Sequence, residues 1–306
     1  MFAFVDVLLF MRKLYWSLWV TLAIAITNTS AQESIREEWL AKDLANITLM
    51  SKFLPIERQV PQKLIDELGL KFSSGAQEII LVDPSDDFGF DYKRINLNRP
   101  GGYCDVSLKG YLFRNRFTYY RLGISCSLDS WKKIASRVIK IWEINIGKGY
   151  LRKDDGVYFE KDFDEALQSY KLAVNAEFGR LNTVNVPRDL KQEYEALISP
   201  FQNPTIGRDG CGVAGIVPWG KRYIDSLVKQ NRIDLLENIV RGFNPGGRIY
   251  ALVALLEFKS KGVTLSRATE ESLQKVSEFE SKVEFCSGGT ISFKSAGEIL
   301  KEYNLK

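Results

Sequence analysis

The clearest pattern in the chain is a pair of stretches in which apolar and polar side chains alternate. They run from Tyr103 to Phe113 and from Phe117 to Cys126, and such alternation is typical of β-strands. The link Arg114–Arg116 suits a three-residue hairpin loop, in which Asn115 can adopt an unusual backbone angle. We therefore predict an antiparallel hairpin folded about Asn115.

The register of this hairpin predicts a disulfide. Folding about Asn115 places three pairs on one face, namely Leu108 with Leu122, Val106 with Ile124, and Cys104 with Cys126. A slip of one residue would turn Cys126 to the opposite face. Cys104 is therefore expected to bond Cys126, which leaves Cys211 to bond Cys286 among the four cysteines.

The opposite face of the predicted hairpin is aromatic and basic. It carries Lys109, Tyr111, Phe113, Phe117, Tyr119 and Arg121. One interpretation is a binding platform for a glycan or an anionic polymer. The other is a sheet buried on both faces, one of them beneath a following helix, because aromatic cross-strand pairs commonly stabilise sheets.

Segments with helical spacing and further predicted strands flank the hairpin in the sequence. Together they predict an α+β domain over residues 32–146. Apolar residues recur at helical spacing in Ser34–Leu54, and a stripe of Trp131, Ile134, Val138, Ile141 and Trp142 predicts a helix from Asp129 or Ser130 to Ile146. A short helix is expected from Pro61 to Gly69. Strands are expected at Glu78–Val82 and, more weakly, at Phe88–Leu97.

Residues 147–209 are predicted to be a helical connection. The segment Lys161–Ala173 is similar to the second half of a tetratricopeptide unit, but residues 147–157 do not match the first half, so we expect a single amphipathic helix. A polar stretch follows with prolines at 187, 200 and 204. Such stretches are typical of domain boundaries.

Residues 210–306 are predicted to form a mostly helical C-terminal domain. Helices are expected at 223–229, 233–241, 248–259, 268–282 and 296–303, with a small hairpin turning at 287–289. The stretch Ile233–Leu256 combines an apolar first helix, Pro245 in the turn, and Arg248 with small residues opening the second helix. It resembles a HEAT-type helical hairpin, which implies stacked helices that present a protein-binding surface.

The first thirty residues have the three parts of a secretory signal. Met11–Lys13 is basic, Leu14–Ile26 is almost uncharged and apolar, and Thr29–Ala31 provides small residues for cleavage after Ala31. Because residues 1–10 do not suit a basic leader, we expect translation to start at Met11 and residues 1–31 to be removed. The alternative is an uncleaved anchor, although the apolar run is shorter than the ~20 residues of a spanning helix.

Composition narrows the function classes. The 306 residues contain no histidine, which excludes Ser-His-Asp and Cys-His catalysis and imidazole metal sites. A formal charge of +4 is too small to indicate a nucleic-acid partner. An even number of cysteines without a Cys-x-x-Cys motif favours disulfides in an exported chain.

Several short motifs have weaker interpretations. Residues 210–215 match the Gly-x-Gly-x-x-Gly spacing, but no buried strand precedes them and Pro218 follows, so nucleotide binding is not expected. An acidic loop (Asp83, Asp86, Asp87 and Asp91) could hold calcium, but it lacks the spacing of an EF-hand. A second acidic group (Asp154, Asp155, Glu160, Asp162 and Asp164) fits a solvated loop and helix start. Asn46–Thr48 is a glycosylation sequon. We predict no metal and no cofactor.

The sequence therefore favours a secreted or periplasmic, disulfide-stabilised protein of α+β class. We predict that it is not an enzyme and that it binds a protein partner through its C-terminal helices. After signal cleavage we expect no membrane contact. The alternative is a glycan-binding protein or a glycan hydrolase that uses two carboxylates, because histidine-free hydrolysis of glycans remains chemically open.

Overall fold

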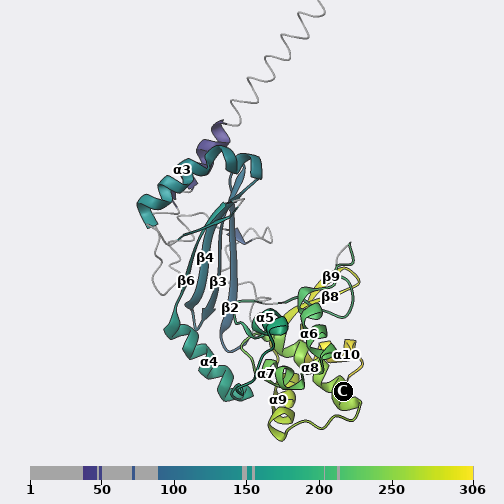
Figure 1. The fold of residues 1–306 in the computed structure, drawn as a ribbon. Coiled ribbons are helices and arrows are strands. Elements are labelled where there is room, and N and C mark those ends of the chain that lie inside the picture. Colours follow the sequence, from purple (N-terminus) through teal and green to yellow (C-terminus); the bar gives the residue numbers. More distant parts are fainter. Residues whose placement is uncertain are drawn as a thin grey trace, which may run out of the picture. The chain divides into compact units, whose positions relative to one another are not determined.

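The computed structural model describes residues 37–46, 48–49, 71–72, 89–146, 150–153, 156–202, 204–211 and 214–305. These residues form an α+β fold, as the sequence predicts (Figure 1). The chain divides into two compact units. The described residues of the first lie within the ranges 1–55, 99–106 and 123–158, and those of the second lie within 56–98, 107–122 and 159–306. The predicted signal peptide, the helix at 61–69 and the strand at 78–82 lie outside the described residues.

A six-stranded sheet has the order β1-β2-β3-β4-β6-β5. Its strands are β1 (Lys71–Phe72), β2 (Tyr92–Pro100), β3 (Cys104–Phe113), β4 (Arg116–Cys126), β5 (Tyr150–Lys153) and β6 (Gly156–Asp162). The last two strands lie in the segment expected to be a helical connection. Gly156 permits this arrangement, because a Cβ there would lie 1.9 Å from the Ile124 carbonyl oxygen.

The turn between β3 and β4 differs from the predicted three-residue loop. It has two residues, Arg114 and Asn115, with φ of 50° and 59°, the left-handed values of a type I′ turn. Strand β3 has 10 residues and β4 has 11, yet the disulfide joins their far ends at a Cα–Cα distance of 4.1 Å. Strand β4 therefore accommodates one extra residue, as in a β-bulge, which restores the predicted register at the cysteines.

The extra residue also changes which face Phe117 occupies. Phe117 and Tyr120 are three positions apart, and both rings pack against Phe163 at 6.2 and 5.9 Å. Residues an odd number apart share a face only across a bulge. The bulge thus lies between them, and Phe117 does not join Phe113, whose ring packs against Tyr170.

In the first unit, a helix over residues 37–46 and α3 (Leu128–Ile146) match the predicted helices. Trp131, Ile134 and Val138 of the predicted stripe are buried. The buried Asp43 carboxylate accepts the backbone N–H groups of Gly102 and Tyr103 at 2.7 and 3.0 Å. This helix is therefore tied to the loop that follows β2.

The second unit is largely helical. Its elements are α4 (Asp164–Phe178), η2 (Arg188–Leu190), α5 (Lys191–Ile198), α6 (Trp219–Lys229), α7 (Ile233–Ile239), α8 (Pro245–Ser260), α9 (Arg267–Glu278) and α10 (Ala296–Glu302). Every residue from Pro245 to Leu255 is buried, so α8 is the central helix of this unit. Asn244 caps α8 by accepting the Gly247 N–H at 2.9 Å.

A small sheet accompanies these helices in the order β7-β8-β9. Strand β7 (Ile206–Gly207) is parallel to β8 (Lys282–Ser287), which is antiparallel to β9 (Thr290–Ser295). Strand β8 begins where the sequence predicts the end of a helix, and α9 ends four residues earlier, at Glu278. The predicted hairpin turn is present, with Gly288 and Gly289 at φ of 56° and 87°.

Candidate functional site

Both predicted disulfides are present. Cys104 is bonded to Cys126 in the first unit, and Cys211 is bonded to Cys286 in the second. All four cysteines are therefore used in crosslinks, and none is free for nucleophilic or metal chemistry. Two disulfides fit an extracellular, disulfide-stabilised protein.

The predicted aromatic platform is largely enclosed. Tyr111, Phe113 and Phe117 are buried, and Tyr111 stacks with Tyr92 at 5.7 Å. Tyr119 is half-buried against Phe201, and burial together with Glu160 raises its pKa. Their rings form contacts within the fold, as in the second of the two interpretations of this face.

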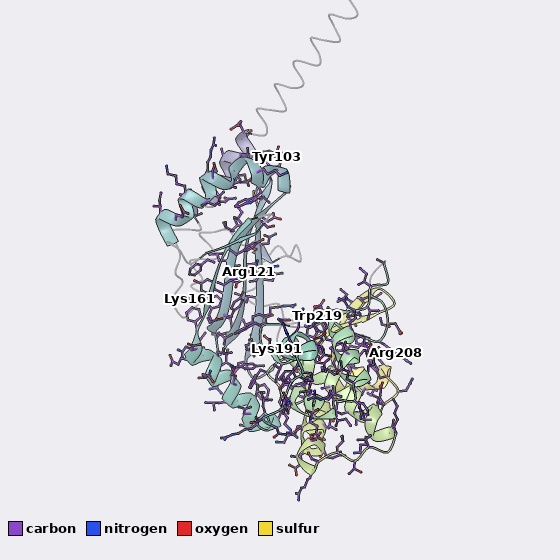
Figure 2. The ribbon with its side chains drawn as sticks, in the orientation of Figure 1. Tyr103, Arg121, Lys161, Lys191, Arg208 and Trp219 are labelled. Carbon is purple, nitrogen blue, oxygen red and sulfur yellow. A yellow bond between two sulfur atoms is a disulfide. The ribbon has the colours of Figure 1, made fainter. Side chains whose placement is uncertain are left out.

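The two basic residues of the platform lie nearer the surface. Lys109 is exposed. Arg121, which Figure 2 labels on the sheet, is half-buried, and its Nε lies 3.4 Å from Glu160. The face therefore offers separate polar groups rather than a continuous aromatic surface.

An exposed isoleucine lies opposite each cysteine of the Cys211–Cys286 disulfide. Ile291 lies opposite Cys286 in the β8–β9 register, and Ile216 lies opposite Cys211 in an isolated bridge. Their exposed fractions are 54% and 67%, and Val217 and Phe293 are 39% and 37% exposed. We call these four residues the disulfide patch. Patches of exposed apolar side chains are characteristic of interaction surfaces.

Strand β9 presents one open edge beside this patch. Within the described residues it pairs only with β8. The two-residue turn makes Ser287 and Thr290 the closing pair, so alternate residues of β9 direct their backbone groups to the other side. Those residues are Ile291 and Phe293, whose side chains belong to the patch. No pattern in the sequence indicates this site, because Ile291 and Phe293 lie in a short strand after a turn, without a motif of their own.

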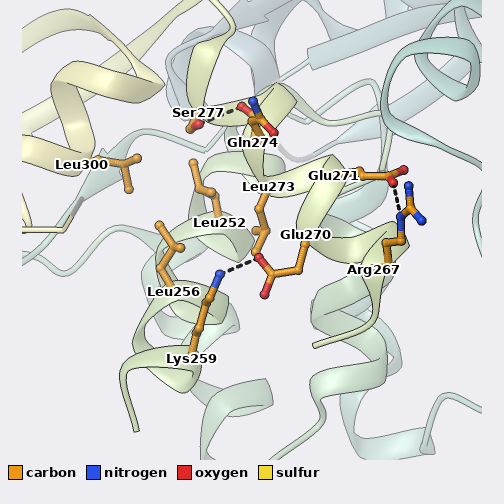
Figure 3. Close-up of a pocket in the computed structure, with 10 residues that line it drawn as sticks. All are labelled: Leu252, Leu256, Lys259, Arg267, Glu270, Glu271, Leu273, Gln274, Ser277 and Leu300. Carbon is orange, nitrogen blue, oxygen red and sulfur yellow. Dashed lines mark hydrogen bonds and ion pairs between the residues drawn. The ribbon is translucent and has the colours of Figure 1, made fainter. Parts of the chain in front are cut away.

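A hollow of about 380 Å³ lies between α8, α9 and α10 (Figure 3). Its apolar lining comes from Leu252, Leu256, Leu273 and Leu300. At its rim, Lys259 is 2.6 Å from Glu270 and Arg267 is 2.9 Å from Glu271. Because both carboxylates are held by cations, neither is placed as a free general acid or base.

The remaining motifs have local structural explanations. Cys211 of the Gly-x-Gly-x-x-Gly segment exchanges two backbone hydrogen bonds with Ile216, of 2.8 and 3.1 Å. Of the first acidic loop only Asp91 is described, and of the second Asp164 lies in the first turn of α4. Asn46 of the sequon is 6% exposed, and its Nδ2 is enclosed. This folded helix therefore leaves little room for a glycan.

Comparisons with known protein families, with curated proteins and with solved structures found no match. Among the described helices, none has the length and apolar character required to cross a lipid bilayer.

Proposed function

We propose that this chain is an exported, disulfide-stabilised interaction protein that binds an extended segment of a protein partner along β9. The observation that carries the proposal is the coincidence of an open strand edge with the disulfide patch. A partner strand would pair with the free backbone groups of Ile291 and Phe293, and its apolar side chains would contact the patch.

The disulfide supports this arrangement by holding the two halves of the patch together. Cys211 and Cys286 are separated by 75 residues, and the bond brings the turn that bears Ile216 to the strand pair that bears Ile291. A surface that is ordered before binding loses less conformational entropy when the partner arrives. The patch is therefore expected to depend on oxidising conditions.

A site-specific crosslinking experiment tests the proposed surface. A photoreactive side chain at position 291, in cells that export the protein, should capture a partner, whereas the same group at position 172 should not. Leu172 is the matched control because it is 66% exposed but belongs to α4. Equal crosslinks at both positions, or none at either, would contradict the proposal.

Backbone variants separate strand addition from simple apolar contact. Phe293→Pro removes an N–H that faces the open edge, so it should abolish partner capture while the pairing with β8 persists. Phe293→Leu keeps the N–H and an apolar side chain and should retain capture. Equal capture by both variants would show that β9 does not pair with the partner.

Export is tested on the mature chain. We expect its N-terminus to be Gln32 and its non-reduced peptide map to contain Cys104–Cys126 and Cys211–Cys286. Mass spectrometry of natively localised protein measures both properties. Four free thiols, or a retained leader, would overturn the proposed location.

A further inference from the structure

The second unit buries a guanidinium without a carboxylate. Arg241, just after α7, is 4% exposed; its Nε donates to Ser272 Oγ at 3.3 Å and its Nη2 to Thr269 Oγ1 at 2.6 Å. No carboxylate of the described residues forms an ion pair with it. A buried positive charge held only by neutral hydroxyls is costly unless an anion joins it.

Arg241 lies in the lining of a cavity of about 290 Å³. The cavity is bounded by the end of α4, the segment after it, and residues 268–275 of α9. The Nη1 of Arg241 makes no hydrogen bond within the described part of the chain. Gly179, with φ of +93°, allows the chain to pass close to this guanidinium, since a Cβ there would lie 3.5 Å from Arg241 Cδ.

The other charges around the cavity leave it positive. Arg180 and Lys275 join Arg241, against the carboxylates of Glu177 and Glu271. Glu271 is held at 2.9 Å by Arg267; Lys275 Nζ donates to the Glu177 carbonyl oxygen at 2.7 Å and lies 4.0 Å from the Glu177 carboxylate. Arg180 is exposed and forms no ion pair with the residues described. Both carboxylates thus face a cation, while Arg180 and Arg241 remain available.

The start of α9 adds backbone donors. Ser266 caps this 12-residue helix by accepting the Thr269 N–H at 3.2 Å, but the N–H of Ala268 has no partner among the described residues. Ala268 lines the cavity beside Arg241. Helix N-termini carry partial positive charge and favour anions.

We propose that the cavity formed by Arg241, Arg180, Lys275 and the first turn of α9 binds a small oxyanion, a phosphate or a carboxylate group. The guanidinium supplies a planar pair of donors that suits either group. The cavity is larger than one such group, so the anion can be free or the end of a larger ligand. This site is separate from the disulfide patch, and either proposal can fail alone.

Titration of the mature protein with inorganic phosphate and, separately, with acetate tests the site, with chloride at equal ionic strength as reference. We expect one or both oxyanions to raise the melting temperature saturably, because a ligand that binds only the folded state stabilises it. If only phosphate binds, the natural ligand carries a phosphate group. If only acetate binds, the ligand carries a carboxylate. No saturable effect from either oxyanion would refute the proposal.

Substitutions of the cations that line the cavity test whether the anion binds there. The double variant Arg180→Gln and Lys275→Gln should weaken anion affinity about tenfold or more. Lys301→Gln removes one positive charge from an exposed position on α10, outside the cavity lining, and should have no effect. Arg241→Lys should weaken binding further if it folds. If it does not fold, the double variant Arg180→Gln and Lys275→Gln tests the site by itself. Equal weakening of anion binding by Lys301→Gln would contradict the proposed site.

Discussion

At the scale of single residues, buried tyrosines connect the core of the second unit to the segment that the sequence marks as a boundary. Each hydroxyl donates to a backbone carbonyl 45 to 108 residues away, at 2.7 to 2.9 Å. Three acceptors lie in that segment: Tyr92 donates to Pro200, Tyr111 to Phe201 and Tyr250 to Thr205, whereas Tyr170 donates to Phe243 between α7 and α8. The proline-marked segment is therefore held to the core by these hydrogen bonds.

These tyrosines predict a loss of stability in alkali. Burial raises the pKa of Tyr92, Tyr170 and Tyr250 in the folded state. Their contribution is complete below the unfolded tyrosine pKa of about 10 and is lost as the pH rises above it, because only the unfolded state then releases protons. Each tyrosine should lower the free energy of unfolding by about 1.4 kcal/mol per pH unit in this range.

Urea unfolding at several pH values between 9 and 11 measures this slope. Tyr250→Phe should be less stable at neutral pH by about 1 kcal/mol, through loss of its hydrogen bonds. Its slope above pH 10 should nevertheless be shallower than that of the wild type. Identical slopes would show that Tyr250 ionises in the folded state.

At the scale of elements, the β3–β4 hairpin forms the predicted disulfide, although its turn and its register near the turn differ from the prediction. The turn is one residue shorter than expected, and the extra residue in β4 compensates, so Cys104 still faces Cys126. Alternation near the cysteines reports the register there, because the strand period is two. It cannot report a bulge nearer the turn, where Tyr111, Leu112 and Phe113 are all buried and no alternation remains.

The turn itself predicts opposite effects of two substitutions. Asn115 is exposed with φ of 59°, so Asn115→Gly should stabilise the protein by up to about 1 kcal/mol. Asn115→Ala should destabilise it by about 1 kcal/mol, since alanine tolerates this conformation poorly. Chemical denaturation compares the two variants. A stabilising alanine would mean that the turn is not left-handed.

At the scale of the whole molecule, each compact unit contains one disulfide. The first crosslink closes 22 residues and the second closes 75. In the chain-entropy description, a crosslink stabilises by restricting the unfolded chain, and the effect grows with the logarithm of the loop. The second unit therefore gains more from its crosslink than the first.

Removal of each pair of cysteines checks this difference. Replacing Cys104 and Cys126 by alanine should cost about 3 kcal/mol, and replacing Cys211 and Cys286 about 4.5 kcal/mol. Hydrogen exchange resolved by peptide measures the loss in each unit. A larger cost for the shorter crosslink would contradict the entropic explanation and indicate loss of native contacts.

The sequence alone determined the α+β class, most C-terminal helices, and which cysteines bond, because periodicity and register are local properties of the chain. Only the tertiary structure decided that residues 150–162 form strands, that Tyr111, Phe113 and Phe117 are enclosed, and that Arg241 borders a cavity. It also placed Ile216 beside a disulfide whose other end lies opposite Ile291. Burial and proximity between distant segments depend on how elements pack, and no spacing within one segment encodes that packing.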